Sequence, residues 1–106
     1  MHKGKYPELK LLYHIPNGGK RSKSEAGRFK AEGVKSGVPD ICLPVARGKY
    51  NGLYLELKKK HGGKLSDNQK SWIENLSREG YFAVVCAGWE ESVKRISECL
   101  TMGRNQ

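Results

Sequence analysis

A chain of 106 residues is long enough for one domain with a single modest core. Its apolar fraction of 37% and mean hydropathy of −0.70 are typical of a soluble protein. No stretch approaches the roughly 18 apolar residues of a membrane span, and no signal-peptide pattern opens the chain. We therefore expect one domain over residues 1–106, with its core at about 7–100, and no contact with a membrane.

Positive charge is concentrated in the first part of the chain. The formal net charge is +9; residues 1–64 carry +10 and residues 65–106 carry −1. Lysine and arginine contacts with phosphates release condensed counterions, so a basic surface of this kind favours a polyanionic partner. The alternative is that the lysines merely keep the protein in solution, but their one-sided distribution argues against it.

The three cysteines, Cys42, Cys86 and Cys99, are odd in number and form no C-x-x-C pair. Each lies inside an apolar run, which predicts buried, reduced thiols. Reduced thiols indicate a reducing compartment, so we expect the protein in the cytoplasm.

The first part of the chain predicts a strand, a loop and a helix. Apolar and polar residues alternate over 7–16, as in a half-buried strand. Glycines and basic residues over 17–24 predict a turn or a loop that touches nucleic acid. A helix is expected over 25–33, where Gly33 would end it.

Two short apolar runs, at 38–43 and 53–58, are separated by a segment rich in turn-forming residues. This arrangement predicts a β-hairpin with its turn near Gly48 and Lys49. Pro39 lacks a backbone N–H, so the first strand either begins there or lies at an edge of the sheet.

The hairpin carries charged residues where a plain buried strand has none. Antiparallel pairing sets Asp40 roughly opposite the stretch from Glu56 to Lys58. Side chains alternate along a strand, so Glu56 and Lys58 share one face. Two carboxylates and a lysine would then converge on one edge of the sheet.

The last part of the chain predicts two more helices and a strand. Ser66 and Gln69 fit a capping box, and that helix would stop at Gly80. The apolar run 81–87 is typical of a central strand buried on both faces, and 90–100 should form a final helix. The order of elements is that of a mixed α/β domain.

Asp40 and Glu56 are suited to a hard divalent cation, which takes oxygen ligands. The backbone carbonyl of Leu57 could add a third oxygen. Lys58 could orient a water or neutralise charge on the transition state of phosphodiester hydrolysis. The alternative is a surface salt bridge between Glu56 and Lys58, with Asp40 as a turn residue.

The sequence resembles the PD-(D/E)-x-K nucleases through Pro39-Asp40 and Glu56-Leu57-Lys58. More closely, it resembles the VRR-NUC (virus-type replication-repair nuclease) family over roughly 7–100. The supporting stretches are HIPNGGKR, KAEGVKSGVPDICLPV, GLYLELKKKHGGKLSDNQKSWIENL and GYFAVVCAG.

The resemblance implies a restriction-endonuclease-like α/β fold, a mixed sheet flanked by helices. It also implies Mg²⁺- or Mn²⁺-dependent cleavage of DNA. The short stand-alone members that the chain resembles are phage proteins that dimerise and cut branched DNA, including Holliday junctions. A phage-encoded member would act in the cytoplasm of its bacterial host.

By this resemblance, Asp40 and Glu56 are metal ligands, Lys58 is the catalytic lysine and Gln69 is a helix glutamine near the site. As a capping-box residue, Gln69 could equally have a structural role, and the two roles are compatible. We expect DNA contacts from the polar and basic residues of the loops, namely Asn17, Lys20, Arg21, Lys23, Lys35, Lys59, Lys60 and Lys64.

Larger members of the family begin with a helix whose glutamate joins the active site, and the chain starts too late for it. Glu8 is expected on the first strand, and Glu25 and Glu32 as solvated helix charges. Either the site manages without that carboxylate or a second subunit compensates. The missing helix would also leave one sheet face uncovered, which favours a homodimer.

Two other functions remain open. A non-catalytic module that binds nucleic acid would use the carboxylates structurally. An RNA-directed nuclease of the same fold is also possible, although no aromatic-rich strand face suited to base stacking is evident.

Overall fold

The computed structural model of the protein describes residues 6–16, 36–59, 61 and 63–103. The elements in chain order are the 3-10 helix η1 (Pro7–Leu11), β1 (Tyr13–His14), β2 (Ile41–Leu43), β3 (Leu53–Lys58), α2 (Asp67–Arg78), β4 (Phe82–Ala87) and α3 (Trp89–Leu100). None of the helices in these residues is long and apolar enough to cross a bilayer.

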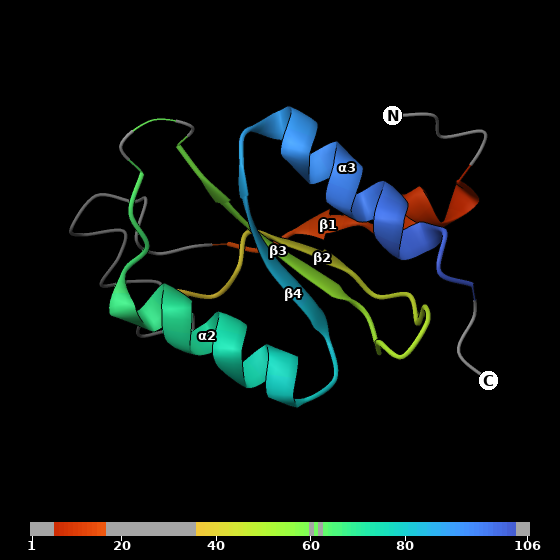
Figure 1. The fold of residues 1–106 in the computed structure, drawn as a ribbon, viewed down its shortest axis with the longest axis horizontal. Coiled ribbons are helices and arrows are strands. Elements are labelled where there is room, and N and C mark those ends of the chain that lie inside the picture. Colours follow the sequence, from red (N-terminus) through yellow and green to blue (C-terminus); the bar gives the residue numbers. More distant parts are fainter. Residues whose placement is uncertain (1–5, 17–35, 60, 62, 104–106) are drawn as a thin grey trace.

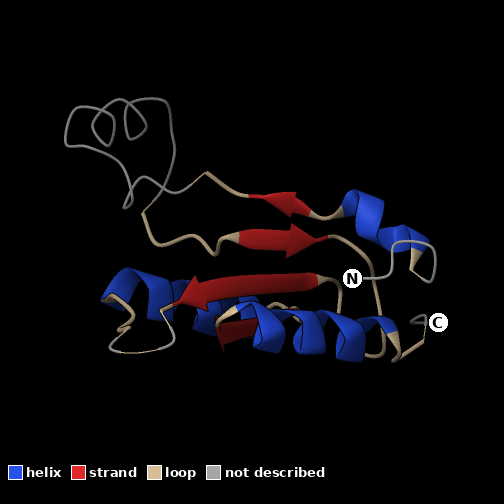
Figure 2. Cartoon of the chain, turned by 90° about the horizontal axis from the view of Figure 1, so that it is seen from above, coloured by secondary structure: helices blue, strands red, loops and turns tan. Residues whose placement is uncertain are grey.

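The strands form one mixed sheet in the order β1-β2-β3-β4. β1 pairs antiparallel with β2 and β2 antiparallel with β3, whereas β3 and β4 are parallel. Helices α2 and α3 contact β3 and β4 and lie on opposite faces of the sheet (Figure 1). Seen from above, α3 lies in front of the sheet and α2 behind it (Figure 2). The expected mixed α/β fold is confirmed.

The predicted hairpin is β2 and β3. Arg47 and Tyr50 close its turn with two backbone hydrogen bonds of 3.0 and 2.8 Å, so Gly48 and Lys49 form the turn as expected. Ile41 pairs with Leu55. β2 begins directly after Pro39 and Asp40 and lies between β1 and β3, so the proline is accommodated at the start of an inner strand.

The main core lies between the sheet and α3. The strand register places one set of apolar side chains on this face: Ile41, Leu43, Leu53, Leu55, Phe82, Val84 and Cys86. Ile96, Cys99 and Leu100 of α3 complete the cluster. All three cysteines are buried and free, as the sequence predicts.

The predicted capping box at the start of α2 is present. The Ser66 hydroxyl accepts a hydrogen bond from the Gln69 backbone N–H at 3.1 Å. The Gln69 side-chain carbonyl accepts one from the Ser66 N–H at 2.7 Å. Gly80 follows the helix with a φ of +90°, a left-handed conformation that glycine adopts readily.

Residues 7–16 were expected to form a strand, and that prediction is wrong for most of the segment. Pro7 begins the 3-10 helix, with its φ already suited to a helical turn, and the strand is reduced to Tyr13 and His14. Glu8 therefore lies on η1. The loop expected at 17–24 and the helix expected at 25–33 lie outside the described residues.

The apolar run at 81–87 was expected to form a central strand buried on both faces, and this is also wrong. β4 has β3 as its one neighbour within the described residues, and most of its side chains are half-buried. β3 is the well-buried inner strand instead, although its sequence carries charges. An apolar run therefore fixes neither how deeply a strand is buried nor where it stands in the strand order.

Candidate active site

Asp40 and Glu56 lie opposite each other at one end of the hairpin. Continuing the register by one pair beyond Ile41 and Leu55 sets Asp40 against Glu56, as the sequence predicts. Both residues are fully buried, with 0% exposure. Asp40 directly precedes β2 and Glu56 lies in β3, and these are the two inner strands. The carboxylates therefore lie within the sheet, and the expectation that they converge on its edge is wrong.

Hydrogen bonds fix Asp40 at the start of β2. Its Oδ2 accepts a hydrogen bond from the Leu57 backbone N–H at 2.8 Å, which ties the side chain directly to β3. Its backbone carbonyl accepts one from the Ile15 N–H at 2.7 Å, which ties it to the chain after β1. The aspartate is thus held from both sides and has little freedom to change its orientation.

Lys58 lies on the same face of β3 as Glu56 and is exposed at the end of the strand. Its side chain lines a cavity of about 310 Å³. The lining residues are Leu57, Lys58, Lys59, Gly63, Lys64, Leu65 and Gln69. Three lysines around one cavity form a local positive surface that suits an anion such as a phosphate. This basic surface adjoins the buried carboxylates along β3, where Glu56 is two residues before Lys58.

Gly37 brings the loop before Asp40 against the start of α2. Its φ is +87°, and a Cβ built on it would lie 2.7 Å from Asn68 atoms and 2.9 Å from the Gln69 nitrogen. Real Cβ atoms essentially never approach other heavy atoms this closely, so a side chain does not fit here. No role was predicted for Gly37, although its place three residues before Asp40 was a usable signal.

Gln69 has the structural role that the sequence allowed, because its side-chain carbonyl caps α2. It also lines the lysine-rich cavity next to Lys58. The geometry thus agrees with both of the roles left open for this residue.

The donor set fits a hard divalent cation. Two carboxylates buried opposite each other repel, and a cation bound between them would remove that repulsion. In the part of the chain that the structure describes, no third His, Cys, Asp or Glu joins them. A backbone carbonyl such as that of Leu57, water and substrate oxygens would complete the coordination.

The structure describes few of the residues expected to contact nucleic acid. Lys59 and Lys64 are exposed and line the cavity beside Lys58. The others lie outside the described residues: Asn17, Lys20, Arg21, Lys23, Lys35 and Lys60.

Glu8 is engaged away from the site. Its carboxylate accepts a hydrogen bond from the buried guanidinium of Arg47, with a separation of 2.5 Å between nitrogen and oxygen. Arg47 belongs to the turn, at the opposite end of the hairpin from Asp40. Glu8 therefore does not supply the carboxylate that larger family members carry on their first helix. Glu25 and Glu32 lie outside the described residues.

A row of side chains on the face of Glu56 was also missed. Tyr13 of β1 pairs with Cys42 of β2, which pairs with Tyr54 of β3, so the three share one face. Burial and the neighbouring Cys42 thiol raise the pKa of Tyr54 to about 12. No aromatic-rich strand face suited to base stacking was evident in the sequence, because the two tyrosines are far apart in the chain and share a face only through the strand register.

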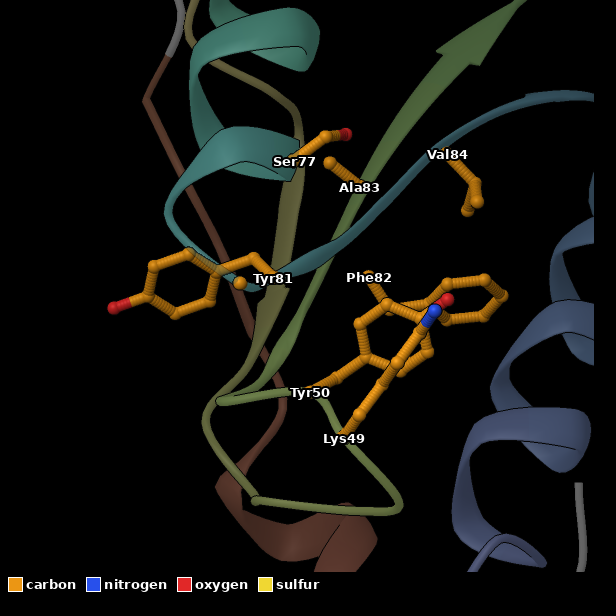
Figure 3. Close-up of a pocket in the computed structure, with 8 residues that line it drawn as sticks. Lys49, Tyr50, Ser77, Tyr81, Phe82, Ala83 and Val84 are labelled. Atoms are coloured by element: carbon orange, nitrogen blue, oxygen red, sulfur yellow. The ribbon is translucent and has the colours of Figure 1, made fainter.

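A second cavity beside the sheet does not resemble an active site. It measures about 520 Å³ and lies beside the hairpin turn (Figure 3). Its lining residues are Lys49, Tyr50, Ser77, Gly80, Tyr81, Phe82, Ala83 and Val84. Phe82 lies beside Tyr50, whereas the Tyr81 ring points to the other side of the strand (Figure 3). This lining contains no carboxylate, whereas Asp40 and Glu56 lie at the opposite end of the hairpin.

The mixed sheet, with Asp40, Glu56 and Lys58 on its hairpin, is the architecture of the PD-(D/E)-x-K nucleases. Comparison with known proteins agrees. A model of the VRR-NUC domain matches residues 3–90. A solved structure described as a VRR_NUC domain protein is 36% identical, with a TM-score of 0.77 over 91% of this chain and 72% of the other. No curated protein matches. The chain belongs to the VRR-NUC family, a family of nucleases.

Proposed function

We propose that the protein is a Mg²⁺- or Mn²⁺-dependent endonuclease that hydrolyses phosphodiester bonds in DNA. The observation that carries the proposal is the pair of buried carboxylates, Asp40 and Glu56, next to a cavity that Lys58 and two further lysines line. Buried acids beside an exposed basic surface are what a phosphate-cleaving site requires, since the same site must hold a cation and attract a polyanion.

Each residue has a distinct task in this mechanism. Asp40 and Glu56 hold the cation, and the carbonyl of Leu57 is placed to assist. When bound, the cation makes a coordinated water more acidic and offsets charge on the phosphate. Lys58 stabilises the negative charge that develops on the phosphate oxygens. Gln69 positions the start of α2 beside the cavity and offers its amide group to the site.

DNA would approach over the lysines at the end of β3. Lys59 and Lys64 contribute phosphate contacts there, and the sequence carries further basic residues at 17–35. Such contacts are independent of base sequence and weaken as salt is raised. Lys60 belongs to the same basic run.

Branched DNA, such as a four-way junction, is the substrate we propose, with a homodimer as the active form. The support is the outer edge of β4, which is apolar and carries no described neighbour. Such an edge is a template for a second copy of the chain. Two sites in one assembly would cut two strands of a symmetric junction.

The edge can be tested with a matched pair of proline substitutions. The Phe82 N–H donates to Gly52 on the β3 side, so the Ala83 N–H points away from β3 and that of Val84 points toward it. Ala83→Pro should preserve the fold and yield a monomer in light scattering. Val84→Pro should destabilise the fold itself, because it removes a ladder bond. An Ala83→Pro protein of unchanged mass would contradict this interface.

The activity test compares cleavage of a four-way junction and a linear duplex, with Mg²⁺, with Mn²⁺ and in EDTA. Lys58→Ala should lower the rate about 100- to 1,000-fold, a typical loss for a group that stabilises the transition state. Asp40→Asn should also abolish most of the activity. Lys49→Ala is the control, because Lys49 is exposed at the other end of the hairpin. Undiminished cleavage by the Asp40 and Lys58 variants would refute the site.

The hydrogen bond from Leu57 to Asp40 favours a second candidate, a non-catalytic module in which that carboxylate is structural. It predicts salt-sensitive DNA binding that is indifferent to EDTA and no cleavage of any substrate.

A further inference from the structure

The sheet face that carries the carboxylates also carries a row of tyrosines. Tyr13, Cys42 and Tyr54 lie side by side on β1, β2 and β3. Neighbouring strands lie about 4.8 Å apart, so the row extends about 10 Å across the sheet. This row has no part in the hydrolysis described above.

Tyr13 is the accessible member of the row. It is 51% exposed, whereas Cys42 is buried. The Cys42 thiol beside Tyr13 raises the pKa of Tyr13, as it does that of Tyr54, which places both phenols next to this one thiol. The exposed ring of Tyr13 therefore belongs to the sheet and lies beside the small side chain of Cys42.

The other end of the row is held rigidly. Tyr54 packs edge-on against Tyr81, with ring centroids 5.2 Å apart and an interplanar angle of 78°. Tyr54 is half-buried in this contact. On this face of the sheet, the Tyr54 ring is thus fixed by its contact with Tyr81, and the Tyr13 ring is exposed.

The row is close to the carboxylates. Cys42 is two residues from Asp40 on the same face, and Tyr54 is two residues from Glu56. Two residues along a strand span about 7 Å. A nucleotide next to a phosphate held at Asp40 and Glu56 can therefore place its base over the tyrosines, provided that the base is not paired within a duplex.

We propose that Tyr13 stacks on an unpaired base of the DNA strand whose phosphate lies at Asp40 and Glu56, and that it thereby favours branched over fully paired DNA. The inference rests on the proposed nuclease function and names the feature of the substrate that this site selects. A paired base is stacked inside the duplex and cannot reach the ring, whereas a base at a branch or flap can. Stacking on an aromatic ring is tolerant of base identity, so the preference is for structure.

The experiment measures stacking without cleavage. DNA with a short single-stranded flap carries the fluorescent base 2-aminopurine at the branch, and binding is followed in EDTA at low salt, where the strand stays intact. The wild type and Tyr13→Phe should quench the fluorescence. Tyr13→Ala should not, and its affinity for the flap should fall about 5- to 100-fold, with its affinity for the paired duplex unchanged. Trp89→Ala is the control, since Trp89 is 59% exposed at the start of α3, on the other face.

The outcomes separate the inference from the proposed function. Equal quenching by Tyr13→Ala and the wild type would overturn the stacking role even if the protein cleaves junctions. A Tyr13→Ala protein whose mass changes in light scattering while quenching persists would assign Tyr13 to a subunit contact instead. Absence of metal-dependent cleavage in the wild type would refute the nuclease proposal, whereas the stacking measurement in EDTA would still stand.

Discussion

Replacing Gly37 with alanine should displace α2 relative to Asp40. Two independent effects oppose the substitution. The φ of +87° is unfavourable for any residue with a Cβ, at about 1–2 kcal/mol. The new Cβ would also meet Asn68 atoms at 2.7 Å, and overpacking of this kind costs about 1–3 kcal/mol. Together they predict a loss of about 2–5 kcal/mol in the free energy of unfolding.

A second glycine separates the two effects. Gly88 has a φ of +92°, but a Cβ built on it would have nothing within 4 Å. Gly88→Ala should therefore show a conformational effect alone, at about 1–3 kcal/mol, because its φ of 92° and ψ of 169° lie in a region that essentially only glycine adopts. The difference between the two variants measures how tightly the loop before Asp40 packs on α2.

Urea unfolding followed by circular dichroism measures both values. With a slope of about 1–3 kcal/mol per molar urea, the midpoint of Gly37→Ala should fall by about 1–2 M or more. Cleavage should fall further than the folded fraction explains, because Lys58 and Gln69 would no longer face a correctly placed Asp40. Equal destabilisation of Gly37→Ala and Gly88→Ala would refute the close approach.

Three further variants test the roles of single groups. Glu56→Gln should abolish cleavage yet raise the free energy of unfolding in EDTA by about 0.5–2 kcal/mol, since repulsion with the facing carboxylate disappears. Mg²⁺ should raise the melting temperature of the wild type but not of this variant, and the reverse would exclude Glu56 as a ligand. Gln69→Glu keeps the capping box with Ser66, so the stability should not change. Reduced cleavage would then show that the side-chain amide of Gln69 serves the site, whereas unchanged cleavage would assign Gln69 to capping alone. Glu8→Gln should cost about 1–3 kcal/mol by weakening the ion pair with the buried Arg47, at an unchanged cleavage rate per folded molecule. A lower rate would place Glu8 in the site after all.

The hairpin and its charged residues could be predicted because they depend on local patterns. Turn-forming residues between two apolar runs fixed the turn at Gly48 and Lys49, and the pairing that follows sets Asp40 against Glu56. The cap of α2 was predictable for the same reason, since Ser66 and Gln69 are three residues apart.

The features that escaped prediction depend on contacts between distant segments. The pairing of Tyr13 with Cys42 follows from the register of β1 on β2, which nothing near Tyr13 in the sequence reveals. The position of β4 at the edge of the described sheet depends on strand order, which an apolar run does not encode. In the segment before β1, the conformational preference of Pro7 prevailed over an alternating pattern.

The two ends of the β2–β3 hairpin serve different purposes. The turn end is fastened to the rest of the fold by the pair of buried Arg47 and half-buried Glu8, and by a hydrogen bond of 2.8 Å from the Asn51 N–H to the Gly80 carbonyl. The other end holds Asp40 and the exposed Lys58. Because a rigid hairpin transmits its orientation along both strands, fastening the turn adds to the hydrogen bonds from Leu57 and Ile15 that hold Asp40 in place. Changes at the two ends should therefore combine additively, with stability lost at the turn and cleavage lost at the site.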